Sequence, residues 1–155
     1  MGAGRLGRTV ELLRQRSKAR LAVICGSNEG LYRELEERYG DELILLHTTS
    51  DMDLWIHACD AFFTKPGGLS STEAAVAGVP LVHLPPIPGC ETVNARYFSQ
   101  RGMSYLFDEG ELDDLLARLS DPEQRRAMAE SQSRGVNPRS AEEICDLAHR
   151  LVEGA

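Results

Sequence analysis

The sequence predicts an α/β fold in which helices cover both faces of a parallel sheet. Short, uniformly apolar runs recur along the chain, and strands that are buried on both faces have this composition. Amphipathic segments of helical length separate these runs, and glycine or proline stands at most of the junctions. The expected strands are residues 21–25, 43–46, 61–63 and 79–82, with a short last strand at 104–106.

Length and composition limit the classes of protein to which the chain can belong. Its 155 residues suffice for one domain with a buried core, and we expect a single domain over 1–155. A net charge of −7 argues against a nucleic-acid surface, which needs clustered lysine and arginine. No apolar run approaches the roughly 18 residues of a membrane helix. The four cysteines are scattered, which fits reduced thiols, so we expect a cytoplasmic protein.

The first part of the chain alternates between helix and strand. A glycine-rich stretch, 2–7, precedes an expected helix over 9–18. After the strand at 21–25, a Gly-Ser-Asn turn leads into a charged helix over 29–39. Asn28 is a candidate N-cap for that helix, because its side chain can accept from a free backbone N–H group.

A helix is expected over 51–58, and it carries an acidic pair at its start. Asp51 and Asp53 form an Asp-x-Asp pattern, which can hold a divalent ion against a diphosphate. A capping role for Asp51 and a helix-dipole role for Asp53 account for the same two residues. His57 and Cys59 are too few for a tetrahedral site. We therefore expect no metal site and no cofactor.

Residues 60–94 carry the strongest functional signal. The Lys-Pro-Gly-Gly sequence at 65–68 ends a strand, because proline removes a donor and two glycines permit a tight loop. A cap within 70–72 is expected to start a short helix over 73–77. A strand, a glycine loop and a helix N-terminus together form an anion site, where backbone N–H groups face a phosphate. Glu73 in the first turn would bind the hydroxyls of a sugar beside that phosphate, so the stretch predicts a nucleotide-sugar pocket.

The remaining segments support this region. The proline-rich loop at 85–89 leaves the carboxyl edge of the sheet, where ligands bind in open α/β folds. A helix is expected over 91–101, and three amphipathic helices are expected over 111–119, 122–131 and 141–152.

Three motifs in combination resemble one family of enzymes. They are KPGGLSSTEAAVAGVP (65–80), PIPGCETVNA (86–95) and VICGSNEGL (23–31). They resemble the C-terminal domain of the GT-B glycosyltransferases that make glycosyldiacylglycerols, namely the monogalactosyldiacylglycerol synthases and the processive diacylglycerol glucosyltransferases. The lipid II GlcNAc transferase is a more distant relative. The resemblance covers roughly residues 2–107 and is more specific than a lone glycine-rich loop. It implies a Rossmann-like, doubly wound sheet that forms a single C-terminal GT-B half.

The resemblance also implies which residues bind the donor nucleotide and its sugar. Thr48 and Thr49 would meet the base, Met52 would close the base pocket, and Glu73 would bind the ribose hydroxyls. The expected donor-binding residues are Gly26, Asn28, Thr48, Thr49, Met52, Lys65, Gly67, Gly68, Leu69, Ser70, Glu73, Gly89, Cys90, Glu91 and Asn94.

The hexose end of the expected site departs from the family at one position. Glu91 and Asn94 match residues that hold the hexose or its diphosphate, although a first-turn helix carboxylate also accounts for Glu91. Cys90 stands where the diacylglycerol enzymes usually carry glutamine, and a thiol is a weak donor and acceptor. This leaves the identity of the sugar open. Thr48 stands where the family has an aromatic residue, which leaves base stacking open. Lys65 would neutralise phosphate charge, and a surface lysine beside a turn accounts for it equally.

The resemblance also implies a strand that this sequence does not show. In the family a strand precedes the glycine-rich loop and is the central one of the sheet, whereas no apolar run precedes Gly2 here. Doubly wound sheets grow outward from that strand. We therefore expect the first strand to be missing, with marginal stability, a rearranged sheet centre, or a strand supplied by a neighbouring chain as the consequence.

The function implied by the resemblance is that of a donor-binding half. The reaction would be inverting hexosyl transfer from a UDP-sugar to a lipid acceptor such as diacylglycerol. The catalytic base and the acceptor site would lie in an N-terminal domain or a separate chain, through which peripheral membrane contact would occur. Two alternatives stay open: a non-catalytic donor-binding subunit, and a domain like those of UDP-sugar epimerases. No nucleic-acid partner is expected.

Overall fold

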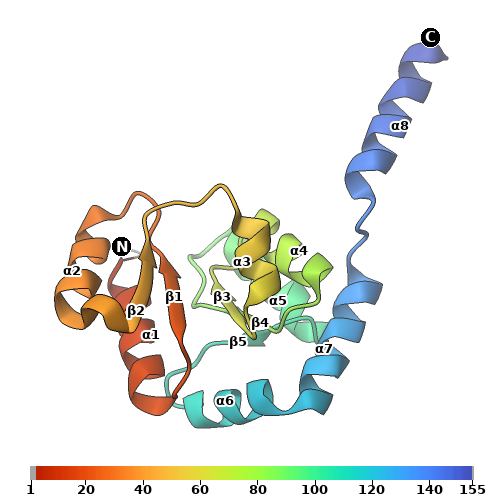
Figure 1. Ribbon diagram of the computed structural model, residues 1–155. Coiled ribbons are helices and arrows are strands. Elements are labelled where there is room, and N and C mark those ends of the chain that lie inside the picture. Colours follow the sequence, from red (N-terminus) through yellow and green to blue (C-terminus); the bar gives the residue numbers. More distant parts are fainter. Residues whose placement is uncertain (1–2, 155) are drawn as a thin grey trace.

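The computed structural model describes residues 3–154, and their side chains from Leu6 onward. Helices and strands alternate along most of the chain (Figure 1). In chain order the elements are α1 (Ala3–Arg16), β1 (Leu21–Ile24), α2 (Glu29–Tyr39), a 3-10 turn (Gly40–Glu42), β2 (Leu43–Leu46), α3 (Met52–Ala58), β3 (Phe62–Thr64), α4 (Gly68–Ala77), β4 (Leu81–His83), α5 (Cys90–Gln100), β5 (Tyr105–Leu106), α6 (Leu112–Ser120), α7 (Pro122–Gly135) and α8 (Ser140–Glu153).

The predicted elements are present, but two helices begin earlier than expected. Helix α1 begins at Ala3, so the predicted glycine-rich loop is helical, apart from Gly2, which lies outside the described residues. A Cβ on Gly7 would lie 3.4 Å from Leu31 Cδ1, so glycine here allows α1 to approach α2 closely. Helix α4 begins at Gly68, so the expected cap within 70–72 is wrong. As a result Glu73 lies in the second turn of α4 rather than the first.

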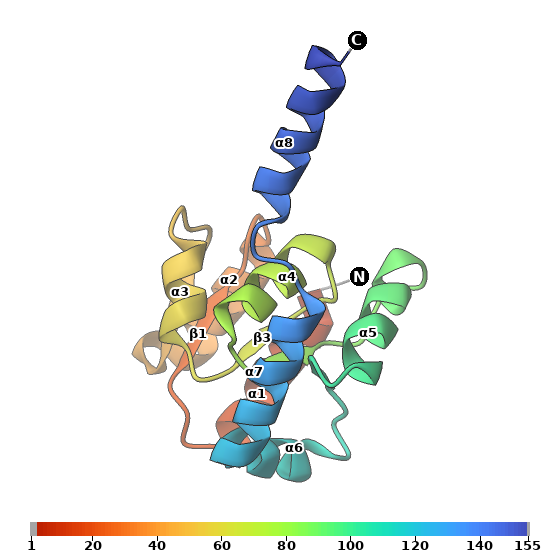
Figure 2. The same ribbon diagram turned by 90° about the vertical axis from the view of Figure 1, so that its right-hand side faces the viewer.

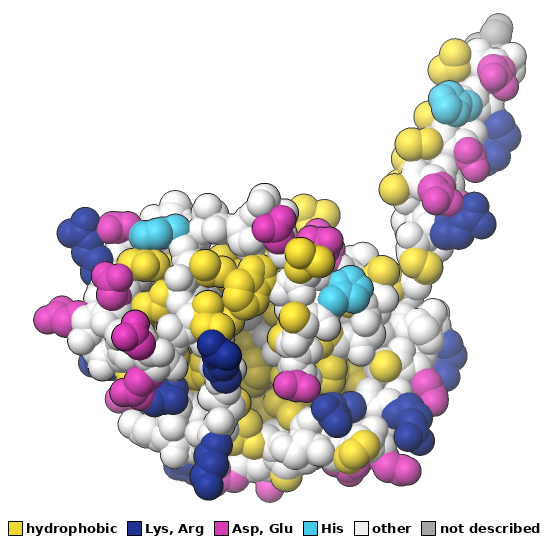
Figure 3. All heavy atoms as spheres, in the orientation of Figure 1, with side chains coloured by type: hydrophobic (Ala, Val, Ile, Leu, Met, Phe, Trp, Pro, Cys, Tyr) yellow, Lys and Arg dark blue, Asp and Glu magenta, His cyan; other side chains and the backbone are white. Residues whose placement is uncertain are grey.

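The described strands form two parallel sheets instead of one continuous sheet. Strand β1 pairs with β2 in one sheet, and the other sheet has the order β3-β4-β5. This break lies at the centre of the fold, where the resemblance implies the missing first strand, so marginal stability, a rearranged sheet centre and a strand supplied by a neighbouring chain all stay predictions. Strand β1 is only partly covered, since Ala22 is exposed and Val23 alone is fully buried. Figure 3 shows apolar side chains in a recess between the part that contains β1 and β2 and the rest of the molecule.

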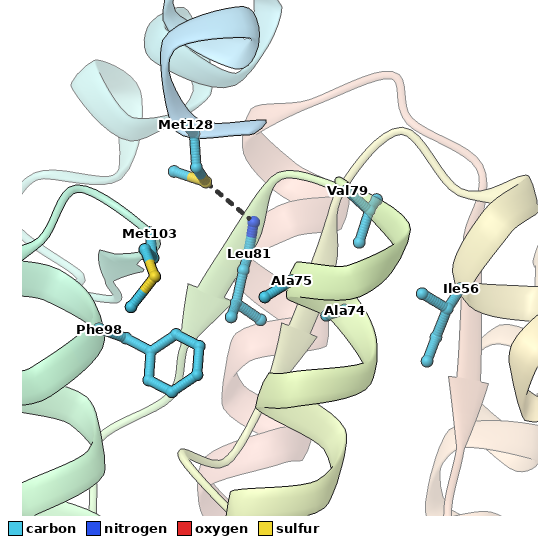
Figure 4. Close-up of a cluster of buried hydrophobic side chains, with 8 residues drawn as sticks. All are labelled: Ile56, Ala74, Ala75, Val79, Leu81, Phe98, Met103 and Met128. Atoms are coloured by element: carbon cyan, nitrogen blue, oxygen red, sulfur yellow. Dashed lines mark hydrogen bonds between the residues drawn. The ribbon is translucent and has the colours of Figure 1, made fainter. Parts of the chain in front are cut away.

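Helices cover both faces of the β3-β4-β5 sheet, as predicted. Successive residues of a strand point to opposite faces, and β4 follows this rule. Leu81 belongs to a cluster with residues of α3, α4, α5 and α7 (Figure 4), whereas Val82 belongs to a cluster with residues of α1 and α6. Alanines at 74 and 75 let α4 lie close to the first of these clusters. The N–H group of Leu81 points to Met128 Sδ at 3.2 Å.

Helix α1 packs against both sheets. Its Leu12 and Leu13 contact the cluster that contains Val82, and its Val10 belongs to a third cluster with Val23 of β1. Buried apolar side chains of α1 therefore join the two sheets.

A buried histidine connects the sheet to α4. The Nε2 atom of His83 lies 2.9 Å from Ser71 Oγ, and its Nδ1 atom lies 3.1 Å from Ser104 Oγ. The residue is 1% exposed, and burial lowers the pKa of the imidazole to about 4. The ring is therefore neutral near pH 7, and one serine hydroxyl donates to it while the other accepts.

Helix α8 leaves the rest of the fold (Figures 1 and 2). None of its residues is buried. Among the residues that the structure describes, no helix has the length and apolar character needed to cross a membrane.

We expect the stability of the protein to fall as the pH is lowered, because of His83. The pKa of His83 is about 4 in the folded protein, against 6.5 for an unperturbed histidine. Between these values the unfolded chain binds a proton that the folded chain does not, so acid favours unfolding. Because of this histidine, the free energy of unfolding should fall by about 1.5 kcal/mol as the pH is lowered from about 6.5 to about 5.

Urea unfolding at the two pH values measures this effect. The variant His83→Gln is less stable overall but should lose this part of the pH dependence. The control variant His57→Gln, at an exposed position, should keep it. An undiminished pH dependence in His83→Gln would contradict the assignment.

We also expect unprotected backbone amides where the two sheets face each other. Cys25 N donates to Leu46 O, so by the alternation of a parallel ladder the amides of Ala22 and Ile24 point away from β2. Phe62 N donates to Pro80 O, so the amide of Phe63 points away from β4.

Hydrogen exchange followed by NMR tests this prediction. Ala22, Ile24 and Phe63 should exchange on the order of 100-fold faster than Val23 and Thr64, whose amides point into a ladder. Equal protection of both groups would show that other backbone groups pair with these edges.

Candidate functional site

Two loops leave the same edge of the β3-β4-β5 sheet. Strand β3 ends at Thr64, and 65–67 lead into α4; β4 ends at His83, and 84–89 lead into α5. Because β3 and β4 are parallel neighbours, both loops lie at the carboxyl edge of the sheet. This edge is where open α/β folds bind ligands.

The N-terminus of α4 presents free backbone donors at this edge. Its N-cap, Gly67, has an extended backbone and no side chain that could cap the helix, and Ser71 N is the first amide to donate to Gly67 O. The N–H groups of Gly68, Leu69 and Ser70 therefore have no partner among the described residues. A Cβ built on Gly67 or Gly68 would meet no atom within 4 Å, so the surface beside these donors is open. This arrangement suits an anion.

The loop before α4 is held from two directions. Gly67 N donates to Lys65 O at 2.7 Å, which closes a tight turn around Pro66, a fully buried residue. Asn94 Nδ2, from the first turns of α5, donates to Pro66 O at 3.0 Å. Asn94 thus positions the glycine loop, and its Oδ1 atom has no partner among the described residues.

The loop before α5 is also held by one of the predicted site residues. Glu91 Oε2 accepts from Ile87 N at 2.8 Å, across the turn that Gly89 makes with φ 122°, a conformation that favours glycine. This bond is the local, first-turn role that the sequence left open for Glu91. The side chain of Cys90 is exposed beside it.

Glu73 and Lys65 are the free charges nearest these loops along the chain. Glu73 is exposed and has no ion pair or hydrogen bond with another described residue. It lies one turn after Leu69 on the same face of α4, since residues four apart on a helix are neighbours. Lys65 is exposed and also has no described partner. Both are available to a ligand that binds at the helix N-terminus.

The predicted residues of the β1–β2 part are arranged mainly by local bonds. Gly26 has φ 62°, and Asn28 Oδ1 accepts from Leu31 N at 3.1 Å, so the predicted cap is confirmed. Thr49 Oγ1 accepts from Asp51 N, and Thr48 is exposed. Met52 is half-buried against the cluster around Leu81, so α3 brings it next to α4.

The structure therefore unites some of the predicted site residues and leaves others apart. The Asn94–Pro66 bond joins the loops of α4 and α5, and Met52 packs beside α4. No hydrogen bond between described residues ties Gly26, Asn28 or Thr48 to these loops. Sequence reasoning missed the bonds that Asn94 and His83 make, because each joins segments far apart in the chain and has no local signal.

The acidic residues do not form a metal cluster within 3–154. No group of three or more histidine, cysteine, aspartate or glutamate side chains there is placed to hold an ion. Asp51 is the N-cap residue of α3, although its side chain makes no capping bond, and Asp53 lies in the first turn. His47 stacks on Tyr32 with 3.8 Å between ring centroids, which accounts for it as a structural residue.

Comparison with known proteins identifies relatives that match most of the chain. The processive diacylglycerol β-glucosyltransferase of Staphylococcus saprophyticus is 31% identical over an alignment of 146 residues, and the match covers 91% of this chain and 37% of that protein. The enzyme of the same name from Bacillus subtilis is 34% identical over an alignment of 109 residues, and the match covers 67% of this chain and 28% of that protein. The chain thus spans less than half the length of these relatives. No protein-family model matches it.

Solved structures show the same fold at lower sequence identity. MurG of Acinetobacter baumannii superposes with a TM-score of 0.73 and 22% identity, covering 97% of this chain and 47% of that one. A protein of Listeria monocytogenes assigned as a UDP-N-acetylglucosamine 2-epimerase superposes with a TM-score of 0.71 and 18% identity, covering 99% and 41%. The chain is a homologue of the processive diacylglycerol β-glucosyltransferases, matching their C-terminal part, and it has the Rossmann-like α/β fold of GT-B glycosyltransferase C-terminal domains.

Proposed function

We propose that residues 1–155 form the UDP-sugar donor-binding half of a hexosyltransferase. The observation that carries this proposal is the N-terminus of α4, which presents three free N–H groups at the carboxyl edge of the sheet. Two exposed charges of the right kinds accompany it: Lys65 for a phosphate and Glu73 for sugar hydroxyls. The relatives that match the chain are named as glucosyltransferases, which supports a hexose as the transferred group.

In the proposed reaction the chain stabilises the leaving diphosphate. As the bond between the hexose and the diphosphate breaks, negative charge grows on the phosphate oxygens. The N–H groups of Gly68, Leu69 and Ser70 are held at the start of α4 without a partner among the described residues, so they need little reorganisation to stabilise that charge. Glu73 would accept hydrogen bonds from the ribose hydroxyls. The free oxygens of Glu91 and Asn94 would contact the hexose, because the other polar atom of each side chain holds a loop.

The acceptor half is proposed to lie outside these residues. The relatives act on diacylglycerol, as their name states, and the chain matches 37% of the first of them. We propose a lipid acceptor of that class, and a catalytic base in an N-terminal domain or a partner chain. The full enzyme would work at the cytoplasmic side of a membrane, and this chain alone would bind donor without transferring it. The epimerase alternative is not favoured, since the sequence relatives are transferases.

We predict that the chain binds uridine ligands through Glu73. Calorimetric titration with UDP, UDP-glucose, UDP-galactose, UDP-GlcNAc and ADP, with and without magnesium, should show saturable binding of the uridine ligands alone. Glu73→Ala should weaken this binding about 30-fold, because hydrogen bonds to a charged group contribute about 2 kcal/mol.

The matched control is Glu37→Ala, which removes an exposed carboxylate from α2. It should leave the affinity unchanged. Equal binding by wild type and Glu73→Ala would show that Glu73 does not contact the nucleoside.

A substitution at the first residue of α4 tests the anion site directly. Gly68→Pro removes one of the three free N–H groups, and proline is well tolerated at this position because Gly67 is already extended. We expect UDP to bind about tenfold more weakly, with no loss of thermal stability, since the deleted N–H group makes no bond within the protein.

Gly68→Ala is the control, because it adds a Cβ into open space and keeps the N–H group. Its affinity should stay within about twofold of wild type, by the small cost of an unstrained surface change. If alanine and proline weaken UDP binding equally, the steric change and not the donor is responsible.

A further inference from the structure

The outer face of α5 combines apolar, aromatic and basic side chains. We define the α5 outer face as Val93, Arg96, Tyr97 and Gln100, which recur at helical spacing, together with Arg101, the C-cap residue of the helix. All five are exposed, and Val93 is 66% and Tyr97 42% accessible. Ala95 and Phe98 face the core instead. Figure 2 shows α5 at the margin of the fold, with no helix or strand outside it.

The charge of this face is opposite to that of the whole chain. It carries two arginines and no carboxylate, in a protein whose net charge is −7. The acid of α5, Glu91, is turned to the loop by its bond from Ile87 N. Arg101 lies over the Tyr97 ring, 3.9 Å from its centroid, and neither Arg96 nor Arg101 forms an ion pair with a described residue.

We propose that the α5 outer face rests on an anionic lipid surface. Arginine, tyrosine and an aliphatic side chain on one side of a helix are the groups that lie at the boundary between headgroups and acyl chains. Two guanidinium groups complement the negative potential of such a surface, and each strengthens the attraction. Neither forms an ion pair with a described residue, although that of Arg101 donates to Tyr97 O at 3.3 Å. This inference rests on the proposed function, because a lipid acceptor requires the enzyme to work at a membrane.

The position of α5 would orient the candidate site towards that surface. Asn94, on the same helix, donates to Pro66 O and so fixes the glycine loop relative to α5. Ile87 lies in the loop that precedes α5 in the chain. Its side chain is 52% exposed, so this loop adds one more accessible apolar group. A chain seated by α5 would therefore hold its donor loops close to lipid headgroups.

Helix α8 offers a larger apolar stripe but the wrong charge. Ile144, Leu147, Leu151 and Val152 are all at least half exposed. The helix, however, contains Glu142, Glu143, Asp146 and Glu153 against a single arginine, Arg150. An anionic surface would repel it, and nothing in the structure shows what covers it.

Sedimentation with lipid vesicles tests the proposal on the full chain. The chain should bind vesicles of equal parts phosphatidylglycerol and phosphatidylcholine, and not vesicles of phosphatidylcholine alone. Replacing both Arg96 and Arg101 by Gln should weaken binding about 30-fold, because each arginine near an anionic surface strengthens binding by roughly five- to sixfold. The control replaces Arg33 and Arg38, both exposed on α2, by Gln and removes the same charge. It should bind as wild type.

A tryptophan reporter locates the contact. The chain has one tryptophan, Trp55, in α3. In the double variant Trp55→Phe, Tyr97→Trp, the emission should shift to the blue when phosphatidylglycerol vesicles are added. An unshifted emission would overturn the proposal, and so would equal binding to neutral vesicles or binding that survives the loss of Arg96 and Arg101.

Two further readouts separate this inference from its rivals. If the chain is a dimer in solution and Val93→Ser dissociates it, the face is an interface between copies and the lipid proposal is wrong. UDP binding of the Arg96, Arg101 variant should equal that of wild type, because neither residue belongs to the candidate site. Loss of vesicle binding with intact UDP binding therefore supports the α5 proposal, whereas absent UDP binding with intact, arginine-dependent vesicle binding would contradict only the donor-site proposal.

Discussion

The packing of α1 against two separate sheets is the constraint on which the rest of the structure depends. No backbone ladder among the described residues joins β1–β2 to β3–β4–β5, so side chains must do this work. Leu12 and Leu13 bury themselves against one sheet while Val10 packs against the other. The ion pairs of α1, such as Arg16 with Asp113 at 2.7 Å, are exposed and contribute little by comparison. A loosening of α1 would therefore weaken the link between the two parts of the molecule, to which Leu21 of β1 also contributes.

The candidate site depends on backbone groups more than on reactive side chains. The donors at the start of α4 are free because Gly67 cannot cap them, and they stay in place because the helix is fixed further along. Ser71 is bonded to the buried His83, and Ala74 and Ala75 pack into the main cluster. The same core contacts that stabilise the domain thus determine where an anion would bind.

Several site residues use one polar atom to hold a loop in place and keep another polar atom free for a ligand. Asn94 uses its amide nitrogen on Pro66 and Glu91 uses one oxygen on Ile87, so each ties down a loop next to the free N–H groups. Replacing either residue would move a loop as well as remove a contact. Glu73 differs from both, because its carboxylate has no partner among the described residues and is exposed. It is therefore the residue whose replacement tests ligand contact most cleanly.

The sequence by itself determined the order and type of the elements and the loop at which the anion site is proposed. Apolar runs, helical periodicity and the glycines at 67, 68 and 78 are local signals, and Gly78 ends α4 with φ 70°. The start of α4 was predicted wrongly, because serine and threonine at 70–72 are good caps and only the packing of the helix makes them internal. Tertiary structure alone decided the division of the sheet, the burial of His83 and the bond from Asn94 to Pro66. Each of these depends on which distant segments meet, and a distance of 28 residues between donor and acceptor leaves no periodic trace in the chain.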